Sequence, residues 1–274
     1  MNYLELKYIQ SHLKKREPFS NKGDYGHALI IAGKKGYMGA AVIASKACIR
    51  SGVGLLTVSV PSEERFILQT TVPEAMLLMR EDDQDNFKKF TAVGIGPGMG
   101  IDAAAEELLL KIMTTCKTPL VLDADALTII SHNKELFNKI PEHTMITPHA
   151  GEFDRLFGKH KNNEERVHTA AQQAKEYRII IVLKGHHTAI ISPEKISYNT
   201  TGNAGLAKGG SGDALTGVIT SFLAQGYSTS VAAEIAVYLH GLAADITLQS
   251  QSMESMIITD VIDYFADAFK EICQ

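Results

Sequence analysis

The stretch that decides the fold of this chain is Asn203-Ala204-Gly205-Leu206-Ala207-Lys208-Gly209-Gly210-Ser211-Gly212-Asp213-Ala214-Leu215. Its glycines leave the backbone without side chains directly before a predicted helix, whose first turn carries Asp213. The helix is predicted because apolar residues recur with helical spacing from position 215 to 223, and Gln225-Gly226 ends the pattern. Free amides at a helix start, together with the helix dipole, attract anions. The stretch therefore predicts an anion cradle with a carboxylate beside it, although alone it also fits an ordinary glycine turn with a first-turn acid.

Outward from this stretch, short apolar runs alternate with helical patterns. The runs predict strands at 27–32, 55–60, 75–79, 91–95, 120–123, 145–147, 179–183 and 188–192. Further helices are predicted at 39–51, 62–68, 103–113, 151–157, 163–177, 231–248 and 259–272. Such alternation is typical of an α/β fold with a mostly parallel sheet covered by helices on both faces. The chain shows no linker or internal repeat, so we expect residues 1–274 to form one domain.

Composition permits an enzyme and argues against several other classes. The chain has 274 residues, 45% of them hydrophobic, which suffices for a substantial core. A net charge of -4 provides no basic surface for nucleic acid. No apolar run is long enough to cross a bilayer, and the charged N-terminus does not resemble a signal peptide. We therefore expect a cytoplasmic protein without a membrane or nucleic-acid partner, in which Cys48, Cys116 and Cys273 are buried reduced thiols.

Two glycine-containing motifs follow predicted strands, and in a mostly parallel sheet ligands bind beyond the carboxyl ends of the strands. Residues 34–41 open a helix rich in small residues, which favours either a tight turn or an exposed set of helix amides. Residues 94–100 only superficially match the dinucleotide fingerprint, because Met99 stands where the third glycine belongs. The second motif is therefore either a plain turn or a backbone surface for a flat ligand.

Three further strand ends carry charged or polar side chains. Asp125 fits the cap of a following helix, whereas Asp123 at the end of a buried strand needs a polar or cationic partner and is the stronger functional candidate. His149 and Glu152 form either an ordinary turn and first-turn acid, or a substrate-facing histidine and a magnesium-side acid.

Lys184 ends another predicted strand and is either a phosphate ligand or a lysine in water. The neighbouring His186 and His187 lack a metal-binding spacing, and we expect them to point to opposite sides of a loop.

In combination these motifs resemble, over nearly the whole chain, the ADP/ATP-dependent NAD(P)H-hydrate dehydratases of the ribokinase-like superfamily. The matching segments are 22–26, 36–41, 50–55, 96–98, 122–127, 147–152, 183–185, 200–203, 209–213 and 238–241. The resemblance implies a ribokinase-like three-layer sandwich. Lys208 departs from the pattern, because a small hydroxyl residue is expected there, and it would add a cation near the phosphates.

The resemblance also implies roles for individual residues. Asp213 would be the catalytic base, and the hydrated cofactor would be faced by Ala41, Gly98, His149 and Asp213. The nucleotide would be held by Lys184, Gly185, His186, His187, Thr188, Asn203, Gly210, Ser211 and Gly212. Glu152 and Asp123 would hold Mg²⁺ through water.

The implied reaction is ADP-dependent repair of hydrated NADH or NADPH. A nucleotide phosphoryl group, from ADP or otherwise ATP, would move to the C6 hydroxyl and then leave as phosphate. A separate NAD(P)H-hydrate epimerase and a homo-oligomeric state are further expectations. A ribokinase-like small-molecule kinase of the hydroxyethylthiazole kinase type, which would release a stable phosphoester, and a silent nucleotide-sensing module are the alternatives.

Overall fold

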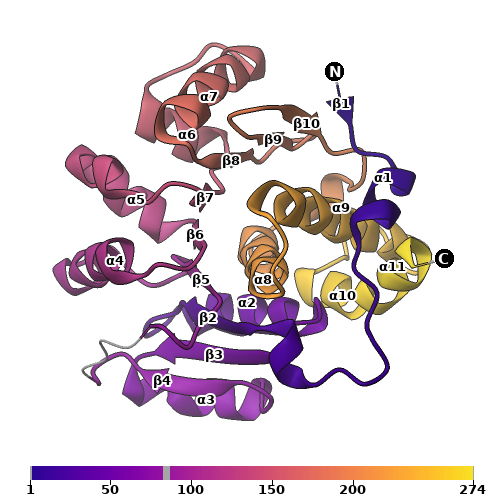
Figure 1. Cartoon of the computed structure of the whole chain (residues 1–274), viewed down its shortest axis with the longest axis horizontal. Coiled ribbons are helices and arrows are strands. Elements are labelled where there is room, and N and C mark those ends of the chain that lie inside the picture. The colour runs from indigo at the N-terminus through magenta and orange to yellow at the C-terminus, as the bar shows by residue number, and fades with distance from the viewer. Residues whose placement is uncertain (1, 83–86, 274) are drawn as a thin grey trace.

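One sheet runs through the chain in the computed structural model, which describes residues 2–82 and 87–273. Within these residues the strands, from one edge of the sheet to the other, are β1 (Asn2–Tyr3), β10 (Ile196–Tyr198), β9 (Ala189–Ile191), β8 (Ile180–Leu183), β7 (Met145–Ile146), β6 (Leu120–Leu122), β5 (Ala92–Ile95), β2 (His27–Ile31), β3 (Leu55–Val60) and β4 (Met76–Met79) (Figure 1). Only the β8–β9 and β9–β10 pairs are antiparallel. The remaining pairs are parallel, which confirms the mostly parallel sheet.

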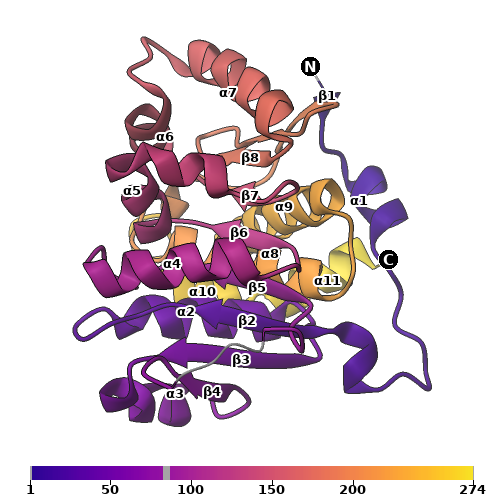
Figure 2. The ribbon, with the colours of Figure 1, turned by 60° about the vertical axis from the view of Figure 1, so that its left-hand side comes forward.

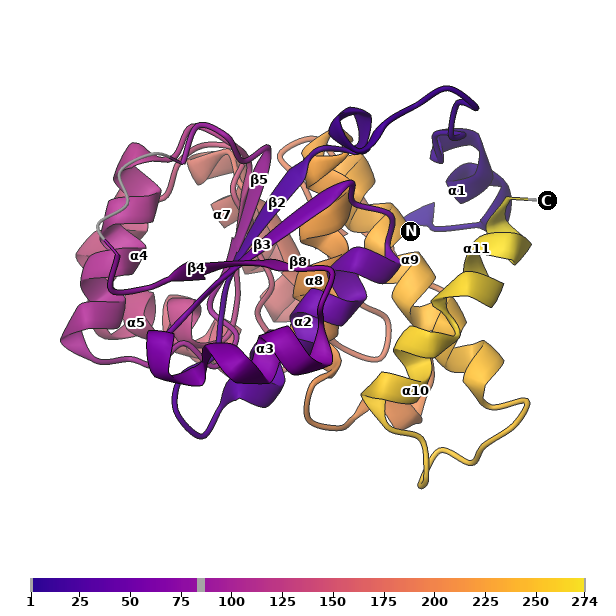
Figure 3. The same cartoon turned by 90° about the horizontal axis from the view of Figure 1, so that it is seen from below.

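Helices cover both faces of this sheet. The helices are α1 (Leu6–His12), α2 (Met38–Arg50), α3 (Arg65–Thr71), α4 (Ala103–Thr115), α5 (Asp125–His132), α6 (Ala150–Phe157), α7 (Asn163–Tyr177), α8 (Ser211–Ala224), α9 (Thr229–Thr247), α10 (Ile258–Asp263) and α11 (Phe265–Ile272). Seen from below, α4, α5 and α7 lie on one side of the strands, and α2 and α8 to α11 lie on the other (Figure 3). Figure 2 brings the first side, with α4 to α7, forward.

The three layers follow from the alternation of side chains along buried strands. Ile30 of β2 packs into the core that contains α2, α8 and α9, whereas its neighbours Leu29 and Ile31 pack into the core beneath α4 to α7. Because successive side chains of a strand point to opposite faces, a strand covered on both sides is apolar throughout. This pattern confirms the three-layer α/β architecture.

Helices α2 and α8 approach each other closely enough to require glycine. A Cβ atom on Gly217 would lie 2.1 Å from the main-chain oxygen of Ala44, well inside contact distance. The small residues of α2 thus allow α8 to pack against it, which fixes the start of α8 beside the strand ends.

Several local expectations differ from the structure. Strands β1 and β10 were not predicted, since two or three residues carry no readable alternation. The helix expected at 259–272 is divided at Tyr264 into α10 and α11. Cys48 and Cys116 are buried free thiols, but Cys273 is exposed because it follows the last turn of α11. None of the helices in the described part of the chain is long and apolar enough to cross a membrane.

Candidate active site

A cavity of about 830 Å³ opens where β6, β7 and β8 end and α8 begins. Five separate segments of the chain contribute to its wall, at 123–124, 149–152, 184–188, 199–215 and 237–241. Among the predicted site residues it is lined by Asp123, His149, Glu152, Lys184, Gly185, His186, Thr188, Asn203, Ser211, Gly212 and Asp213. The sheet continues into this wall, because the backbones of His149 and Lys184 form a parallel bridge beyond β7 and β8.

Four predicted site residues do not line this cavity. Gly98 lies against the start of α2, where a Cβ atom would be 3.0 Å from the main-chain oxygen of Tyr37. Ala41 is fully buried in the first turns of the same helix. His187 and Gly210 are the other two, and the side chain of Ile258 packs against Gly210.

The start of α8 leaves main-chain amides open. Gly210 precedes the helix in the left-handed conformation, with φ of 92°, and no side chain caps the helix. The amide of Ser211 reaches the main-chain oxygen of Lys208 only at 3.5 Å. Within the described residues, the amides of Gly212 and Asp213 have no hydrogen-bond acceptor. These amides lie at the positive end of the helix dipole and have free N–H groups, so the start of α8 suits an anion such as phosphate.

Asp213 lies in the first turn of α8, half-buried beside this opening. Burial raises the pKa of its carboxyl group to about 6, and the negative charge of Asp123 adds to the effect while the positive charge of Lys184 opposes it. The carboxylate makes no hydrogen bond to any described residue. A carboxylate that is free to accept a proton and has a pKa near neutrality is suited to general base catalysis.

Lys184 brings a fixed positive charge to the same place. Its Nζ lies 2.8 Å from Oδ1 of Asp123, and Oδ2 of that buried carboxylate accepts a 2.8 Å hydrogen bond from Thr216. Glu152 is more distant, at 3.8 Å from Nζ. Burial alone would lower the pKa of Lys184, but the two carboxylates more than offset this, and the pKa is raised. The lysine therefore stays charged.

The Lys184 ammonium is adjacent to the open amides, because a Cβ atom on Gly212 would lie 3.2 Å from Nζ. Thr216 was not among the sequence candidates. Its spacing of three residues from Asp213 was the available signal, since residues three apart share one face of a helix.

His149 and Glu152 form a cap at the start of α6. Nδ1 of His149 accepts hydrogen bonds from the amides of Gly151 at 3.0 Å and Glu152 at 3.3 Å, and the Glu152 carboxylate accepts the amide of His149 at 2.8 Å. With Nδ1 acting as acceptor, a neutral imidazole carries its proton on Nε2. The side chain of His149 is half exposed in the cavity, so this imidazole remains accessible to a ligand.

Two finer expectations are wrong. Asp125 does not cap α5; it is the first helical residue, and it accepts the amide of Gly100 at 2.8 Å, which ties together two loops at the strand ends. The rings of His186 and His187 do not diverge, since their centroids are 4.5 Å apart. Lys208, expected as a cation near the phosphates, lines the cavity, and main-chain oxygens bind its ammonium, including that of Met256 at 2.6 Å in the connection between α9 and α10.

The acids of the site do not form a preassembled metal centre. Within residues 2–82 and 87–273, no group of three or more histidine, cysteine, aspartate or glutamate side chains is arranged to hold a metal ion. Both oxygens of Asp123 are engaged by Lys184 and Thr216. Magnesium usually keeps several waters and binds one or two carboxylates together with substrate phosphates. The donor set thus fits an ion that arrives with a nucleotide and contacts the acids through water.

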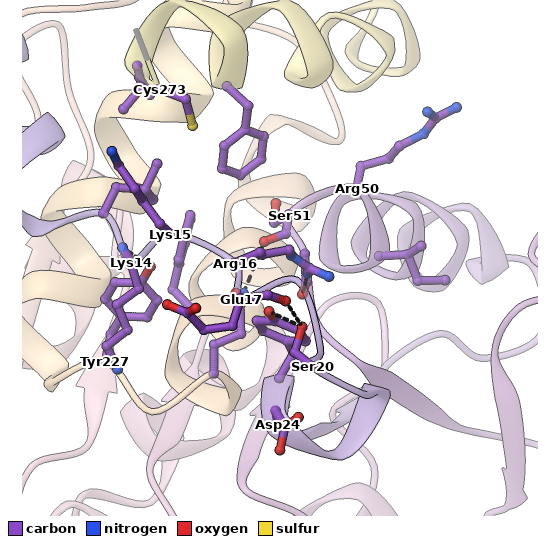
Figure 4. A pocket seen from close by; sticks show the side chains of 18 of the residues that line it. Lys14, Lys15, Arg16, Glu17, Ser20, Asp24, Arg50, Ser51, Tyr227 and Cys273 are labelled. Carbon is purple, nitrogen blue, oxygen red and sulfur yellow. Dashed lines mark hydrogen bonds between the residues drawn. The ribbon is translucent and has the colours of Figure 1, made fainter.

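A second cavity, of about 1290 Å³, contains none of the predicted site residues (Figure 4). Its lining includes Arg16, Arg50, Ser51 and Tyr227, and the last two follow the C-terminal ends of α2 and α8. The 14-residue helix α8 spans about 20 Å at 1.5 Å per residue, so this cavity lies at the opposite end of α8 from the open amides.

Comparison with known proteins decides the family. The model of the NAD(P)H-hydrate dehydratase family matches residues 28–266. The chain belongs to this family. It is 36% identical over 252 residues to the ADP-dependent (S)-NAD(P)H-hydrate dehydratase of Listeria monocytogenes, covering 90% of this chain and 89% of the relative. It is also 33% identical to the bifunctional NAD(P)H-hydrate repair enzyme of Moorella thermoacetica, covering 95% of this chain but 52% of that longer protein.

Solved structures agree with this assignment. The ADP/ATP-dependent NAD(P)H-hydrate dehydratase of Bacillus subtilis, co-crystallised with ATP and Mg²⁺, matches with a TM-score of 0.90 and 30% identity over 99% of this chain and 98% of that one. A ribokinase-like superfamily protein from Enterococcus faecalis matches with a TM-score of 0.90 and 31% identity over 100% of this chain and 97% of that one. A hydroxyethylthiazole kinase from Pyrococcus horikoshii shares the fold alone, at 14% identity and a TM-score of 0.64 over 96% of this chain and 91% of that one. The resemblance inferred from the motifs is confirmed, and the fold is ribokinase-like.

Proposed function

We propose that this chain is a cytoplasmic ADP-dependent NAD(P)H-hydrate dehydratase, acting as a single ribokinase-like catalytic domain that restores hydrated NADH or NADPH. The single observation that carries the proposal is the position of Asp213, with a pKa raised to about 6, in the first turn of a helix whose amides are open. The family membership and the names of the relatives support the substrate.

The chemistry begins with a poor leaving group. Hydroxide leaves carbon with difficulty and phosphate leaves readily, so the terminal phosphoryl group of ADP is first moved to the C6 hydroxyl of the hydrated ring. Asp213 accepts the hydroxyl proton as the oxygen attacks phosphorus. The amides of residues 210–212 and the ammonium of Lys184 stabilise the charge on the moving group, and one such donor is typically worth roughly 3 kcal/mol.

The second step releases phosphate. The ring nitrogen expels the phosphate from C6, and the loss of a C5 proton restores the dihydronicotinamide. The net change converts the hydrate and ADP into NAD(P)H, AMP and phosphate, so the original hydroxyl oxygen departs on the phosphate. In this step the chain only needs to hold the ring in place and exclude water.

Residues around the cavity divide between the two substrates. The hydrated cofactor is faced by Ala41, Gly98, His149 and Asp213, which requires it to reach from the cavity to the start of α2. The nucleotide is held by Lys184, Gly185, His186, His187, Thr188, Asn203, Gly210, Ser211 and Gly212. The neutral Nε2–H of His149 supplies a hydrogen-bond donor to the cofactor.

Magnesium is the metal ion that we propose for this site. Glu152 and Asp123 would hold the ion through water, and a bound Mg²⁺ would neutralise charge on the nucleotide phosphates.

We also propose a homo-oligomer, and a separate epimerase as a functional partner. Relatives named as bifunctional repair enzymes, about twice as long as this chain, support a second repair activity alongside this one. Light scattering of the purified protein tests the oligomeric state.

The experiment incubates purified protein with hydrated NADH, Mg²⁺ and either ADP or ATP. The expected result is regeneration of the near-ultraviolet absorbance of NADH together with one free phosphate per turnover, faster with ADP. Asp213→Asn should abolish turnover and leave nucleotide binding, measured by calorimetry, within about threefold. A retained phosphoester would instead identify a small-molecule kinase, and nucleotide binding without turnover would identify a sensing module.

A further inference from the structure

Lys208 directly precedes the glycine turn of the anion cradle, and main-chain groups far along the chain hold its side chain. Its Nζ donates to the main-chain oxygens of Glu254 and Met256, the latter at 2.6 Å. Met256 is buried in the connection between α9 and α10. A lysine side chain loses up to about 2 kcal/mol of rotational freedom when it is fixed, so two acceptors on one ammonium indicate a specific position.

The glycine turn is packed at Gly210, against the side chains of Ile43 and Ile258, but not at Gly209. A Cβ atom on Gly209 would meet no heavy atom within 4 Å, which means that no neighbouring group packs against this position. The amide of Ser211 reaches the main-chain oxygen of Lys208 only at 3.5 Å, and the main-chain oxygen of Gly210 accepts the amide of Ala214 at 2.9 Å. Glycine backbones lose more freedom on ordering than any others, so such a turn needs an external anchor.

The residues before the turn are anchored at other points. The amide of Gly202 and the side chain of Asn203 donate to the carboxylate of Asp245 in α9, at 2.7 and 2.9 Å. Gly205 packs against Met256, whose Cε would lie 2.4 Å from an added Cβ. Among the hydrogen-bonding side-chain anchors, Lys208 is the nearest in sequence to the open amides, and the same residue supplies the acceptor for Ser211.

We propose that Lys208 is a positioning residue, whose bonds to the α9–α10 connection hold the amides of residues 210–213 ready for phosphate before the nucleotide binds. The ammonium acts through the turn and needs no contact with the nucleotide. The proposal rests on the proposed function in one respect, namely that the cradle receives the phosphates of an adenine nucleotide.

The direct test is amide hydrogen exchange of the ligand-free protein. In Lys208→Met, the amides of Ser211 and Ala214, which bond to the main-chain oxygens of Lys208 and Gly210, should exchange at least about fivefold faster than in the wild type, while amides in the middle of α8 are unchanged. Lys208→Arg, which keeps two donors, should restore exchange to within about twofold of the wild type. Lys159→Met, at an exposed lysine after α6, is the matched control and should change nothing. Unaltered exchange at Ser211 and Ala214 in Lys208→Met overturns the proposal.

Steady-state kinetics give the second readout. Lys208→Met should raise the KM for ADP by about threefold to tenfold with kcat within about twofold, and Lys208→Arg should reverse the change. A fall in kcat with unchanged KM contradicts a positioning role. Absence of turnover in the wild type would defeat the proposed function, whereas the exchange experiment would still decide the role of Lys208.

Discussion

The ammonium nitrogen of Lys184 lies 2.8 Å from a carboxylate oxygen of Asp123, a residue that is only 1% exposed. The other oxygen of this carboxylate accepts a hydrogen bond from Thr216. A buried carboxylate is tolerated only when it is paired and hydrogen-bonded, and here both conditions are met. The pair fixes a positive charge beside Gly212 at the start of α8.

Removing the cation from this pair should destabilise the fold. Lys184→Met leaves Asp123 buried without a counter-ion, and we expect a loss of about 3 kcal/mol in the free energy of unfolding, measured with urea. The double variant Asp123→Leu with Lys184→Met should recover more than about 1 kcal/mol of this loss, because no unpaired charge remains. Equal stability of the single and double variants would contradict the assigned cause.

Activity should fall in mildly acidic solution. Asp213 must be ionised to accept a proton, and its pKa is raised to about 6, so kcat/KM should decrease as the pH falls through this value. The measurement is the pH dependence of kcat/KM between about pH 5 and pH 8. An acid limb at the ordinary aspartate value would show that burial does not act on Asp213 as inferred.

The charge of Asp123 should shift that limb. Since the carboxylate of Asp123 raises the pKa of Asp213, Asp123→Asn should move the acid limb of kcat/KM to lower pH by about half a unit or more. The wild-type profile, recorded at the same ionic strength, is the reference. A limb that stays in place, or moves to higher pH, would exclude this coupling.

The ionised carboxylate of Asp213 should lower the free energy of unfolding at neutral pH. Its pKa is raised from 3.8 to about 6 on folding, so the folded state binds the proton more tightly, and stability declines as the pH rises through this interval. Asp213→Asn removes the penalty, and we expect it to be more stable than the wild type by about 1–2 kcal/mol above pH 6, but not near pH 4. Thermal unfolding at both pH values checks this, with Asp267→Asn at the exposed pair with Lys270 as control.

Close packing of α2 and α8 should make Gly217 irreplaceable. Gly217→Ala places a methyl group 2.1 Å from the Ala44 oxygen, which forces the helices apart and should cost about 3 kcal/mol in unfolding free energy. Gly39→Ala is the matched control in α2, because a methyl group there meets nothing within 4 Å. That variant should be neutral or slightly stabilising by its higher helix propensity. Similar losses in both variants would argue against the packing explanation.

Most of the strands and helices could be predicted from the sequence, because hydrophobic periodicity is a property of short segments. The eight predicted strands correspond to β2 to β9, and the helix at 163–177 coincides with α7, whose side chains follow one helical period. The short strands β1 and β10 could not be predicted, because the pairing of β1 with β10 is decided by contact between distant segments. Cys273 was misjudged for a related reason, since burial depends on what packs over a position.

The sequence alone established the strand and helix alternation, the family resemblance and a carboxylate beside a glycine turn, since backbone freedom and hydrophobic period are properties of short segments. Only the tertiary structure joined Lys184 to Asp123 across 61 positions, Thr216 to Asp123 across 93, and Lys208 to Met256 across 48. Electrostatic energy depends on separation and burial in space, so the charge of Lys184 and the raised pKa of Asp213 exist only once the chain has folded.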